Sequence, residues 1–318
     1  MEVNRHRIEY LDITKGILIF LVVLGHLMPE EEILHIWIYS FHIPAFFIID
    51  GFLLNYRQFE NKEFKTIVLS GIKYLIIPYV IYCIPLLVAR WAASEFDLDN
   101  LYFQIIDMAS MCGIGAMWFL PCLFFARLLF YGVKYITRKF DLKRFTILIS
   151  ILCIFISSLI HYQTSIGLVA LRSFVAVGFI LIGDCTFSKV QEIQKSSKLM
   201  MLCIFIVIFF IITGCNIAAL NVLQFGNIVW YIMNAILGSL VIISISIYLS
   251  RKLLGVWISY LGSNSLFIMG THQLVMLVFS IPIVKNYLTN VLLAFSIVSI
   301  ECIVIKILRG MKGKVKVA

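Results

Sequence analysis

Long apolar stretches alternate with short charged connections along the whole chain. A helix needs roughly 20 apolar residues to cross the hydrocarbon core of a bilayer. Stretches of about this length lie near residues 13–29, 34–55, 67–90, 116–136, 144–161, 166–187, 198–214, 228–249, 254–281 and 286–308. The pattern therefore predicts an all-α, polytopic integral membrane protein with about ten transmembrane helices.

Basic residues fall in every second connection. Nineteen of the twenty-six Lys and Arg residues lie in the segments 1–12, 56–66, 134–144, 188–198, 250–253 and 309–318. The intervening connections hold only Lys285, with Arg90 at a helix border. By the positive-inside rule the basic side is cytoplasmic, so we expect both termini in the cytoplasm.

Composition agrees with this topology. The 318 residues are 62% hydrophobic and 14% charged, with a mean hydropathy of +1.01. Soluble domains carry about 25% charged residues, so we expect a single membrane-embedded domain over residues 1–318 and a multi-pass protein of the plasma membrane. The net charge of +9 is scattered through short loops. This indicates membrane lipids as partners and no nucleic acid.

Four prolines lie inside predicted helices, at Pro44, Pro78, Pro85 and Pro121. Proline lacks an amide hydrogen, and its ring clashes with the carbonyl four residues earlier. We expect these prolines to bend or break their helices, which can open a cavity between helices.

A polar stripe descends the first predicted helix. Asp12, Lys15 and His26 follow helical spacing, with Ile19 and Val22 between them. Lys15 and His26 are eleven residues apart, which places them almost on the same helix face, about 16 Å apart along the axis. Ionisable groups inside a membrane usually face the protein interior or a water-filled cavity. His26 is therefore the first candidate for chemistry.

The second predicted helix carries another polar face. His42, Phe46 and Asp50 recur every four residues and share one side of the helix. In a structural interpretation, His42 and Asp50 pair with neighbouring helices and lock the bundle. In a functional interpretation, they line the cavity that His26 enters. The presence of two ionisable groups on one helix face favours this interpretation.

Two arginines and a late histidine lie inside later predicted helices. Arg127 and Arg172 cannot lose their charge, so each needs an anion, either an internal carboxylate or the phosphate or carboxylate of a ligand. His272 shares a helix face with Ser265, and a lone histidine more often makes a structural hydrogen bond there.

Several kinds of site have no motif in the sequence. No GxxxxGK[ST] or GxGxxG phosphate-binding loop, HExxH zinc motif or GxSxG nucleophile turn is present. The histidines His26, His35 and His42 do not form a metal-ligand spacing with carboxylates. We therefore expect no metal.

Two early segments resemble the acyltransferase-3 family of membrane O-acyltransferases, within it the sugar O-acetylase branch. That family has a basic residue, ten further residues and then a histidine on its first helix, and Lys15 and His26 match this pattern. The segment Phe41-HIPAFFIIDG-51 is similar to the family pattern FHxPxFFxxSG, with Asp50 in place of the usual serine.

Two later segments extend the resemblance in the same order. The segment Met117-WFLPCLFFARL-128 resembles the family's tryptophan-bearing fourth helix. The segment Leu261-GSNSLFIMGTHQL-274 is similar to its late helix that ends in a histidine. The resemblance thus runs over most of the chain and implies the family's fold of ten helices.

The resemblance implies transfer of an acetyl group from acetyl-CoA, taken up on the cytoplasmic side, to a hydroxyl of a cell-surface or lipid-linked saccharide. His26 matches the family's catalytic histidine, and Lys15 matches the basic residue associated with the acyl donor. The other candidates for binding donor or substrate are Asp12, His42, Asp50, Trp118, Arg127, Arg172 and His272.

Two mechanisms and one rival function remain open at this level. His26 can remove a proton from the sugar hydroxyl as the hydroxyl attacks the thioester, or it can form an acetyl-imidazole first. The rival is a polytopic transporter or flippase of a polar solute or saccharide, because buried His, Asp and Arg also line transport paths. Dependence on acetyl-CoA distinguishes the two functions.

Overall fold

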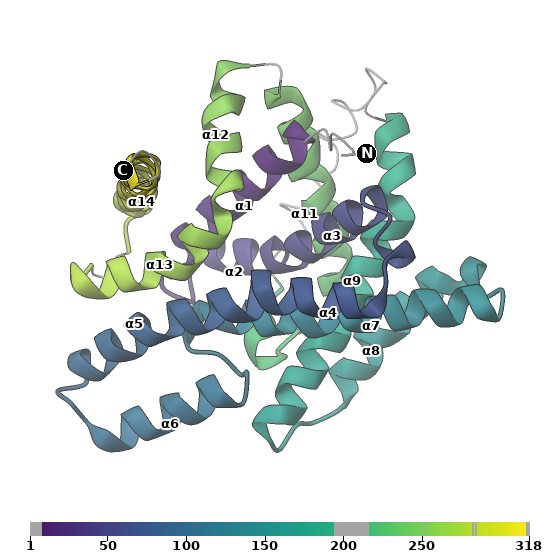
Figure 1. Ribbon diagram of the computed structural model, residues 1–318, viewed down its shortest axis with the longest axis horizontal. Coiled ribbons are helices and arrows are strands. Elements are labelled where there is room, and N and C mark those ends of the chain that lie inside the picture. The colour runs from purple at the N-terminus through teal and green to yellow at the C-terminus, as the bar shows by residue number, and fades with distance from the viewer. Residues whose placement is uncertain (1–7, 194–215, 251, 282, 284, 316–318) are drawn as a thin grey trace. The chain divides into compact units, whose positions relative to one another are not determined.

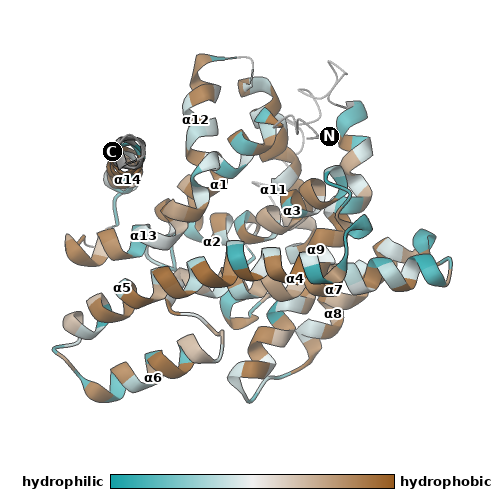
Figure 2. Cartoon of the chain, viewed as in Figure 1, coloured by the Kyte–Doolittle hydropathy of each residue, from teal (hydrophilic) through white to brown (hydrophobic). Residues whose placement is uncertain are grey.

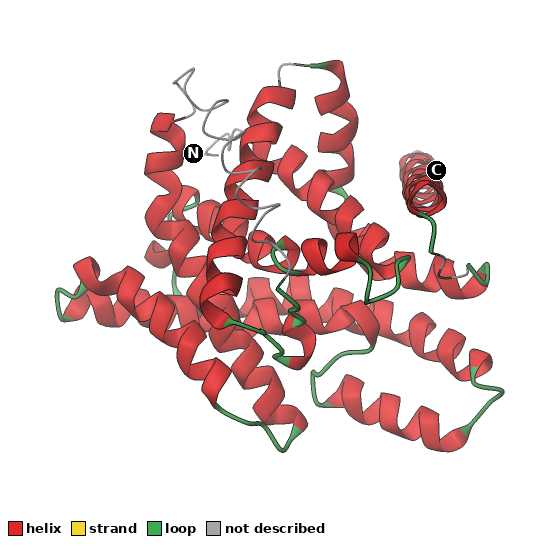
Figure 3. Ribbon diagram, turned by 180° about the vertical axis from the view of Figure 1, so that it is seen from behind, coloured by secondary structure: helices red, strands yellow, loops and turns green. Residues whose placement is uncertain are grey.

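The computed structural model describes residues 8–193, 216–250, 252–281, 283 and 285–315 (Figure 1). Within these residues every regular element is helical, as the red ribbons of Figure 3 show. Six of the described helical segments are long and apolar enough to cross a membrane. They are Ile33–Tyr56, Phe64–Ala93, Gly115–Lys139, Ser165–Glu192, Ile228–Leu249 and Tyr287–Arg309.

The remaining predicted spans have different outcomes. The segments 13–29 and 144–161 are helical, as α1 (Glu9–His26) and α8 (Thr146–Leu159), although neither meets the same criterion of length and composition. The segment 198–214 lies outside the described residues. The count of ten spans therefore stays a prediction, whereas the all-helical class is confirmed for the described part of the chain.

The predicted single helix over 254–281 is wrong. It consists of α12 (Leu253–Ser263) and α13 (Ser265–Val278), which are bent by 75° at Asn264. The amide group of Asn264 donates to the carbonyl oxygen of Tyr260 over 2.7 Å. Asn and Ser side chains compete with the helical backbone for hydrogen bonds, so the sequence Ser263-Asn264-Ser265 favours a break. The bent pair counts as a seventh span if it crosses as one.

The described chain forms two compact units. Unit 1 combines Met1–His35 with Ile242–Ala318, and unit 2 spans Ile36–Val241. The helices α2 (Ile33–Tyr39) and α11 (Ile228–Leu249) carry the chain from one unit to the other.

Unit 1 is organised around the close contact of α1 with α12. A Cβ atom at Gly16 would lie 2.1 Å from the carbonyl oxygen of Ile258, and one at Gly262 would lie 1.7 Å from that of Asp12. Only glycine permits two helix backbones to approach so closely. The helices α13 and α14 (Tyr287–Val315) pack against α1 and against each other.

Unit 2 is built on a second close pair, α3 (His42–Tyr56) and α9 (Ser165–Ile193). The contact is reciprocal: Gly51 meets the carbonyl oxygen of Ile180, and Gly183 meets that of Ile48. The helices α7 (Phe119–Lys139) and α8 pack against α9. This core positions the charged side chains described below.

Further elements of unit 2 lie between α3 and α7 in the chain. They include the turn η1 (Phe59–Asn61), α4 (Phe64–Gly71), the π-helical segment η2 (Ile72–Ile76), α5 (Ile77–Ala93) and α6 (Leu98–Ala109). The short turns η4 (Lys143–Phe145) and η5 (Leu220–Val222) follow α7. Apolar residues predominate along α5 and α8 (Figure 2), and many are exposed in unit 2, including Ile81, Val88 and Leu148. Such faces suit contact with lipid.

Three of the four prolines lie beside an irregular helical segment. The residue four positions before Pro44 is Ser40, at the break between α2 and α3. The corresponding residue for Pro78 lies in η2, and for Pro121 in the 3₁₀ turn η3 (Gly115–Trp118). Pro85 lies inside α5 without interrupting it. The steric clash of proline with the preceding turn explains why these three segments depart from α-helical geometry.

Candidate active site

The first polar stripe forms as predicted on one unbroken helix, α1. Its charged end is an ion pair within a single turn: the ammonium nitrogen of Lys15 lies 3.0 Å from Oδ1 of Asp12. Asp12 is buried and Lys15 partly exposed. The lysine charge is therefore held close to the helix by a partner one turn away, and part of it stays accessible.

The other end of the stripe meets a second histidine. The imidazole of His26 stacks on that of His272 from α13, with ring centroids 5.2 Å apart and planes inclined by 29°. His272 is fully buried, whereas His26 is partly exposed. The structure thus brings together two candidates that are far apart in the sequence, and both belong to unit 1.

The backbone fixes which nitrogen of His272 carries its proton. Nδ1 lies 2.9 Å from the carbonyl oxygen of Ile268. Because a carbonyl only accepts hydrogen bonds, Nδ1 donates, and the neutral ring then carries its lone pair on Nε2. Nε2 is buried and has no hydrogen-bond partner within the described residues. The histidine pair therefore contains a buried basic nitrogen, Nε2 of His272, to which no described group donates a hydrogen bond.

The chain neighbour of His272, Thr271, contacts an acidic side chain. The hydroxyl of Thr271 donates to Oε1 of Glu301 on α14 over 2.6 Å. The other carboxylate oxygen, Oε2, is buried without a hydrogen bond among the described groups. The sequence marks Glu301 as an ionisable residue in an apolar segment but gives no indication that Thr271 is its partner.

The bend at Asn264 is fixed from α14 as well. A guanidinium nitrogen of Arg309 donates to the side-chain oxygen of Asn264 over 2.7 Å. The same asparagine donates to the carbonyl of Tyr260, so its side chain joins α12 to α14. This contact holds the helix that carries His272 in a defined direction relative to α14.

Asp50 and Arg127 form an ion pair in unit 2. Nε of Arg127 donates to Oδ2 of Asp50 over 2.9 Å, and Nη2 donates to Oδ1. Such a two-point contact uses the planar fork of the guanidinium. The anion that the sequence requires for Arg127 is therefore an internal carboxylate, from the residue that stands where the resembled family has serine.

His42 bridges the break between α2 and α3. Its Nδ1 donates to the carbonyl oxygen of Ile38 over 2.7 Å, and the same oxygen accepts from the Phe41 amide over 3.3 Å. Its ring also packs against Tyr39, with centroids 4.9 Å apart. This arrangement agrees with the structural interpretation of His42, and a role in substrate binding stays a prediction.

Arg172 has no ion pair within the described residues. Its guanidinium donates to the carbonyl oxygens of Cys112, over 2.9 Å, and of Asn221. It also lies over the ring of Trp118, with 5.1 Å between the central carbon and the ring centroid. Trp118 and Arg172, both predicted candidates, are thus in contact.

The turn before Trp118 requires glycine. A Cβ at Gly113, whose φ is +82°, would lie 2.3 Å from the amide nitrogen of Trp118.

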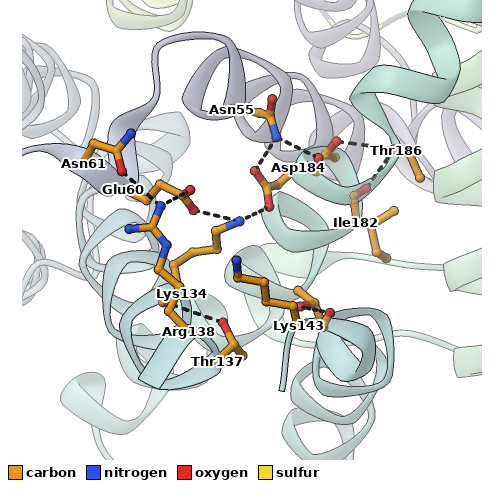
Figure 4. Close-up of polar contacts among 12 residues, drawn as sticks. Asn55, Glu60, Asn61, Lys134, Thr137, Arg138, Lys143, Ile182, Asp184 and Thr186 are labelled. Atoms are coloured by element: carbon orange, nitrogen blue, oxygen red, sulfur yellow. Dashed lines mark hydrogen bonds and ion pairs between the residues drawn. The ribbon is translucent and has the colours of Figure 1, made fainter. Parts of the chain in front are cut away.

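A network of charges joins three helical elements of unit 2 (Figure 4). The ammonium group of Lys134 on α7 lies 2.8 Å from Glu60 and 2.7 Å from Asp184. Asn55 donates to the other oxygen of Asp184 over 2.9 Å, and Arg138 pairs with Glu60. Sequence reasoning missed Lys134, although it follows Arg127 by seven residues on α7 and so shares its face.

The network changes the acidity of Glu60, which lies in η1 between two candidate spans. Burial alone raises the pKa of this carboxyl. Hydrogen bonds and charges from Lys134 and Arg138 outweigh burial, and together they hold the pKa below its ordinary value. Glu60 is therefore ionised near neutral pH and stabilises the network.

The candidate residues fall into separate groups. Asp12, Lys15, His26 and His272 belong to unit 1, and His42, Asp50, Trp118, Arg127 and Arg172 belong to unit 2. Within the described residues no cluster of three or more His, Cys, Asp and Glu side chains could hold a metal ion.

Comparison with known proteins adds evidence of kinship. The acyltransferase-3 family model, described as an acyltransferase domain, matches residues 8–308. This region runs through both compact units, and a single domain over residues 1–318 stays a prediction. No solved structure matches the chain significantly.

Two curated relatives match part of the chain. The nodulation protein NolL of Sinorhizobium fredii is 30% identical over 119 residues, which is 34% of this chain and 32% of that protein. The NolL protein of Mesorhizobium japonicum is 30% identical over 128 residues, 37% of this chain and 34% of that protein. The chain thus aligns with about a third of the length of each relative.

Proposed function

Because the chain belongs to the acyltransferase-3 family and carries several long apolar helices, we propose that this integral membrane acyltransferase transfers an acetyl group from acetyl-CoA to a hydroxyl of a cell-surface or lipid-linked saccharide. The family match over residues 8–308 carries the proposal. The choice of donor and acceptor rests on the resemblance of Lys15, His26 and the segment 41–51 to the sugar O-acetylase branch.

His26 is the proposed catalytic residue. In direct transfer its neutral imidazole removes the hydroxyl proton while the sugar oxygen attacks the thioester carbonyl carbon. The carbon–sulfur bond then breaks, and the CoA sulfur leaves with a proton, so that the products are an O-acetyl ester and CoA. In the covalent alternative the His26 imidazole attacks the thioester, and the CoA thiol leaves. The sugar oxygen then attacks the acetyl-imidazole, and the imidazole leaves with the hydroxyl proton. Partial exposure of His26 supports access for a substrate in either case.

His272 and Lys15 are proposed to assist from opposite ends of α1. His272 stacks on His26 and has a lone pair on Nε2 that no described group uses, so it can fix the ring of His26 or bind the acceptor hydroxyl. Lys15 keeps part of its charge accessible beside Asp12, which suits an anionic part of the donor. No step in this scheme requires a metal.

The proposed topology has ten spans with both termini in the cytoplasm of a plasma-membrane protein. It rests on the alternation of basic connections along the chain. Acetyl-CoA then approaches from the side of Lys62, Lys65 and Lys139, whose positive charges suit its phosphates. The saccharide acceptor approaches through the opposite connections or from the lipid.

A transporter or flippase of a polar solute is the alternative, and the bend between α12 and α13 is the observation that favours it. Broken helices with polar residues at the break often line transport paths, and Asn264 occupies this break. The alternative is favoured by this bend alone, whereas acyl transfer accounts for the family match over residues 8–308.

The test is acetyl transfer by membranes that contain the protein. Membranes with wild-type protein, His26→Ala protein or no protein are incubated with isotopically labelled acetyl-CoA and surface saccharide from cells lacking the protein. We expect label in the saccharide only with wild-type protein, and mild alkali should release it as acetate, as expected for an ester. Equal labelling by the His26→Ala protein at the same level in the membrane would refute the catalytic role of His26. Saccharide without alkali-labile label in every sample would refute acetyl transfer.

A further inference from the structure

Unit 2 contains a polar cavity that the proposed chemistry does not use. Its volume is about 320 Å³, within the range of small-molecule sites. It lies between the end of α6 and the start of α9. Its polar lining comes from Asp107, Tyr162, Gln163, Thr164, Ser165 and Arg172.

The cavity contains a buried positive charge, on which the Asp107 carboxylate of the same lining acts electrostatically without forming an ion pair. The Arg172 side chain forms no ion pair with any described residue, and only 6% of the residue is exposed. Outside the described residues the sequence holds a single acidic residue, Glu2. Burying a charge without an ion pair costs several kcal/mol. An anionic ligand in the cavity would offset this cost for Arg172.

Part of the guanidinium remains available. A guanidinium has five N–H donors, and the hydrogen bonds of Arg172 to the carbonyls of Cys112 and Asn221 involve Nε, Nη1 and Nη2 once each. One hydrogen on each Nη atom therefore has no described acceptor. The carbonyls and the Trp118 ring hold the group in place, and the remaining donors suit a carboxylate or phosphate.

The rest of the lining suits a molecule rich in hydroxyl groups. Tyr162 and Thr164 offer hydroxyls, Gln163 offers an amide, and Asp107 offers a carboxylate whose charge also acts on Arg172. Carboxylate and amide groups bind vicinal hydroxyls, and an aromatic ring can cover the apolar face of a sugar. Tyr162, Gln163 and Thr164 are exposed, so a ligand can reach them.

We propose that this cavity binds the saccharide acceptor through a negatively charged substituent, a carboxylate or a phosphate, that pairs with Arg172. The identification of this ligand as the acceptor rests on the proposed function. The connections 91–115 and 162–165 that form the cavity lack basic residues, so the ligand enters from the non-cytoplasmic side. The cavity selects acidic sugars over neutral ones of the same shape.

Binding is measured without reference to acetyl transfer. A Gln163→Cys variant is labelled with a membrane-impermeant maleimide in intact cells, and then in detergent with added D-glucuronate, glucose 6-phosphate or D-glucose. These three probes share one ring and differ at carbon 6. We expect labelling in intact cells and at least about tenfold better protection by one acidic probe than by glucose. Protection by glucuronate alone identifies a carboxylate ligand, and protection by glucose 6-phosphate alone identifies a phosphate.

Two charge changes in the Gln163→Cys background test the role of Arg172. Arg172→Gln should remove the preference for the acidic probe, whereas Asp107→Asn should strengthen it, because it removes a negative charge from the wall. The second change breaks no described side-chain contact and so keeps the test valid if Arg172→Gln does not fold. Lys285→Gln is the control, since it removes an exposed positive charge from another connection, and it should leave the preference unchanged.

The outcomes separate this proposal from the proposed function. Equal protection by all three probes, or by none, together with normal acetyl transfer to the saccharide, overturns the acidic-acceptor site alone. Charge-selective protection in a protein that transfers no acetyl group supports the site and overturns the acyltransferase assignment. An unchanged preference in both Arg172→Gln and Asp107→Asn overturns the role of Arg172. Ala93→Cys, at an exposed position outside the cavity, should be labelled equally with and without each probe.

Discussion

His26 and His272 stack ring on ring, and the Ile268 carbonyl sets the proton of His272 on Nδ1. His272 can therefore act on His26 only through its ring face or through the lone pair on Nε2. A phenylalanine at position 272 distinguishes the two roles, because it preserves the first and abolishes the second. Phenylalanine keeps a stacking ring of similar size and removes both nitrogens.

We predict that His272→Phe lowers kcat by about a hundredfold, the lower end of the range for loss of a proton-transfer group, and leaves the KM for acetyl-CoA unchanged. The thermal stability in detergent should fall by only about 1 kcal/mol, the usual value of one hydrogen bond. Steady-state kinetics and thermal denaturation check this. A wild-type kcat over the whole pH profile would assign His272 to packing alone.

We predict that Lys15→Ala raises the KM for acetyl-CoA by about tenfold, the effect of one charge-assisted contact, while Lys15→Arg stays near wild type. The reason is that the charge beside Asp12 is partly accessible. Asp12→Asn is the control for the ion pair itself, and it should not weaken donor binding. An unchanged KM in Lys15→Ala would make Lys15 a topology signal only.

We predict that Asp50→Asn and Asp50→Ser both lower stability in detergent, by on the order of 3 kcal/mol, because each leaves the guanidinium of Arg127 without its carboxylate. Asp50→Ser restores the residue usual in the resembled family, and it should retain more turnover than Asp50→Asn if Asp50 also acts in the reaction through its charge. If Asp50 only neutralises Arg127, the two variants should differ little in turnover.

The double variant Asp50→Asn with Arg127→Met is the matched control for that pair. It removes both charges, so its stability should recover most of the loss. Thermal denaturation of the three variants checks the prediction. No recovery in the double variant would show that Asp50 and Arg127 act independently.

We predict a pH dependence of stability that Glu60 helps to set. Its folded-state pKa is lowered by Lys134 and Arg138, so its stabilising effect is present above the ordinary glutamate pKa of about 4.3 and is lost as the pH falls through the lower folded pKa. The melting temperature of wild type should therefore fall more steeply below about pH 4.5 than that of Glu60→Gln. Parallel curves for the two proteins would remove Glu60 as a source of the acid sensitivity.

We predict the topology from charge alone. A reporter that is active only outside the cytoplasm should work after Glu32 or within 95–107 and fail after Lys62, Lys139 or Ala318. Activity of the fusion at Ala318 would mean an odd number of spans and would contradict ten helices.

The sequence predicted the helices and much of the first stripe because both depend on local spacing. An apolar run of sufficient length must satisfy its own backbone hydrogen bonds, and Lys15 and His26 share a face on any unbroken helix. The sequence indicated that Arg127 and Arg172 each need an anion and that Asp50 can pair with a neighbouring helix. Choosing between Arg127 and Arg172 required the packing of α3 and α7.

The features that were missed depend on contacts between distant segments. Hydropathy averages over Ser263-Asn264-Ser265 and so makes 254–281 look like one span. The stacking of His26 on His272 and the bond from Thr271 to Glu301 follow from the packing of α1, α13 and α14. No local pattern encodes these contacts.

The ion pair between α3 and α7 also has a consequence for the order in which the chain is made. Asp50 leaves the ribosome 77 residues before Arg127, and Glu60 likewise precedes Lys134. A guanidinium cannot lose its charge, so an arginine inside a membrane needs an anionic partner. When α7 is inserted, its permanent positive charge therefore finds an acidic partner already in place. The reverse order would leave an unpaired arginine among the lipids until a later helix arrived.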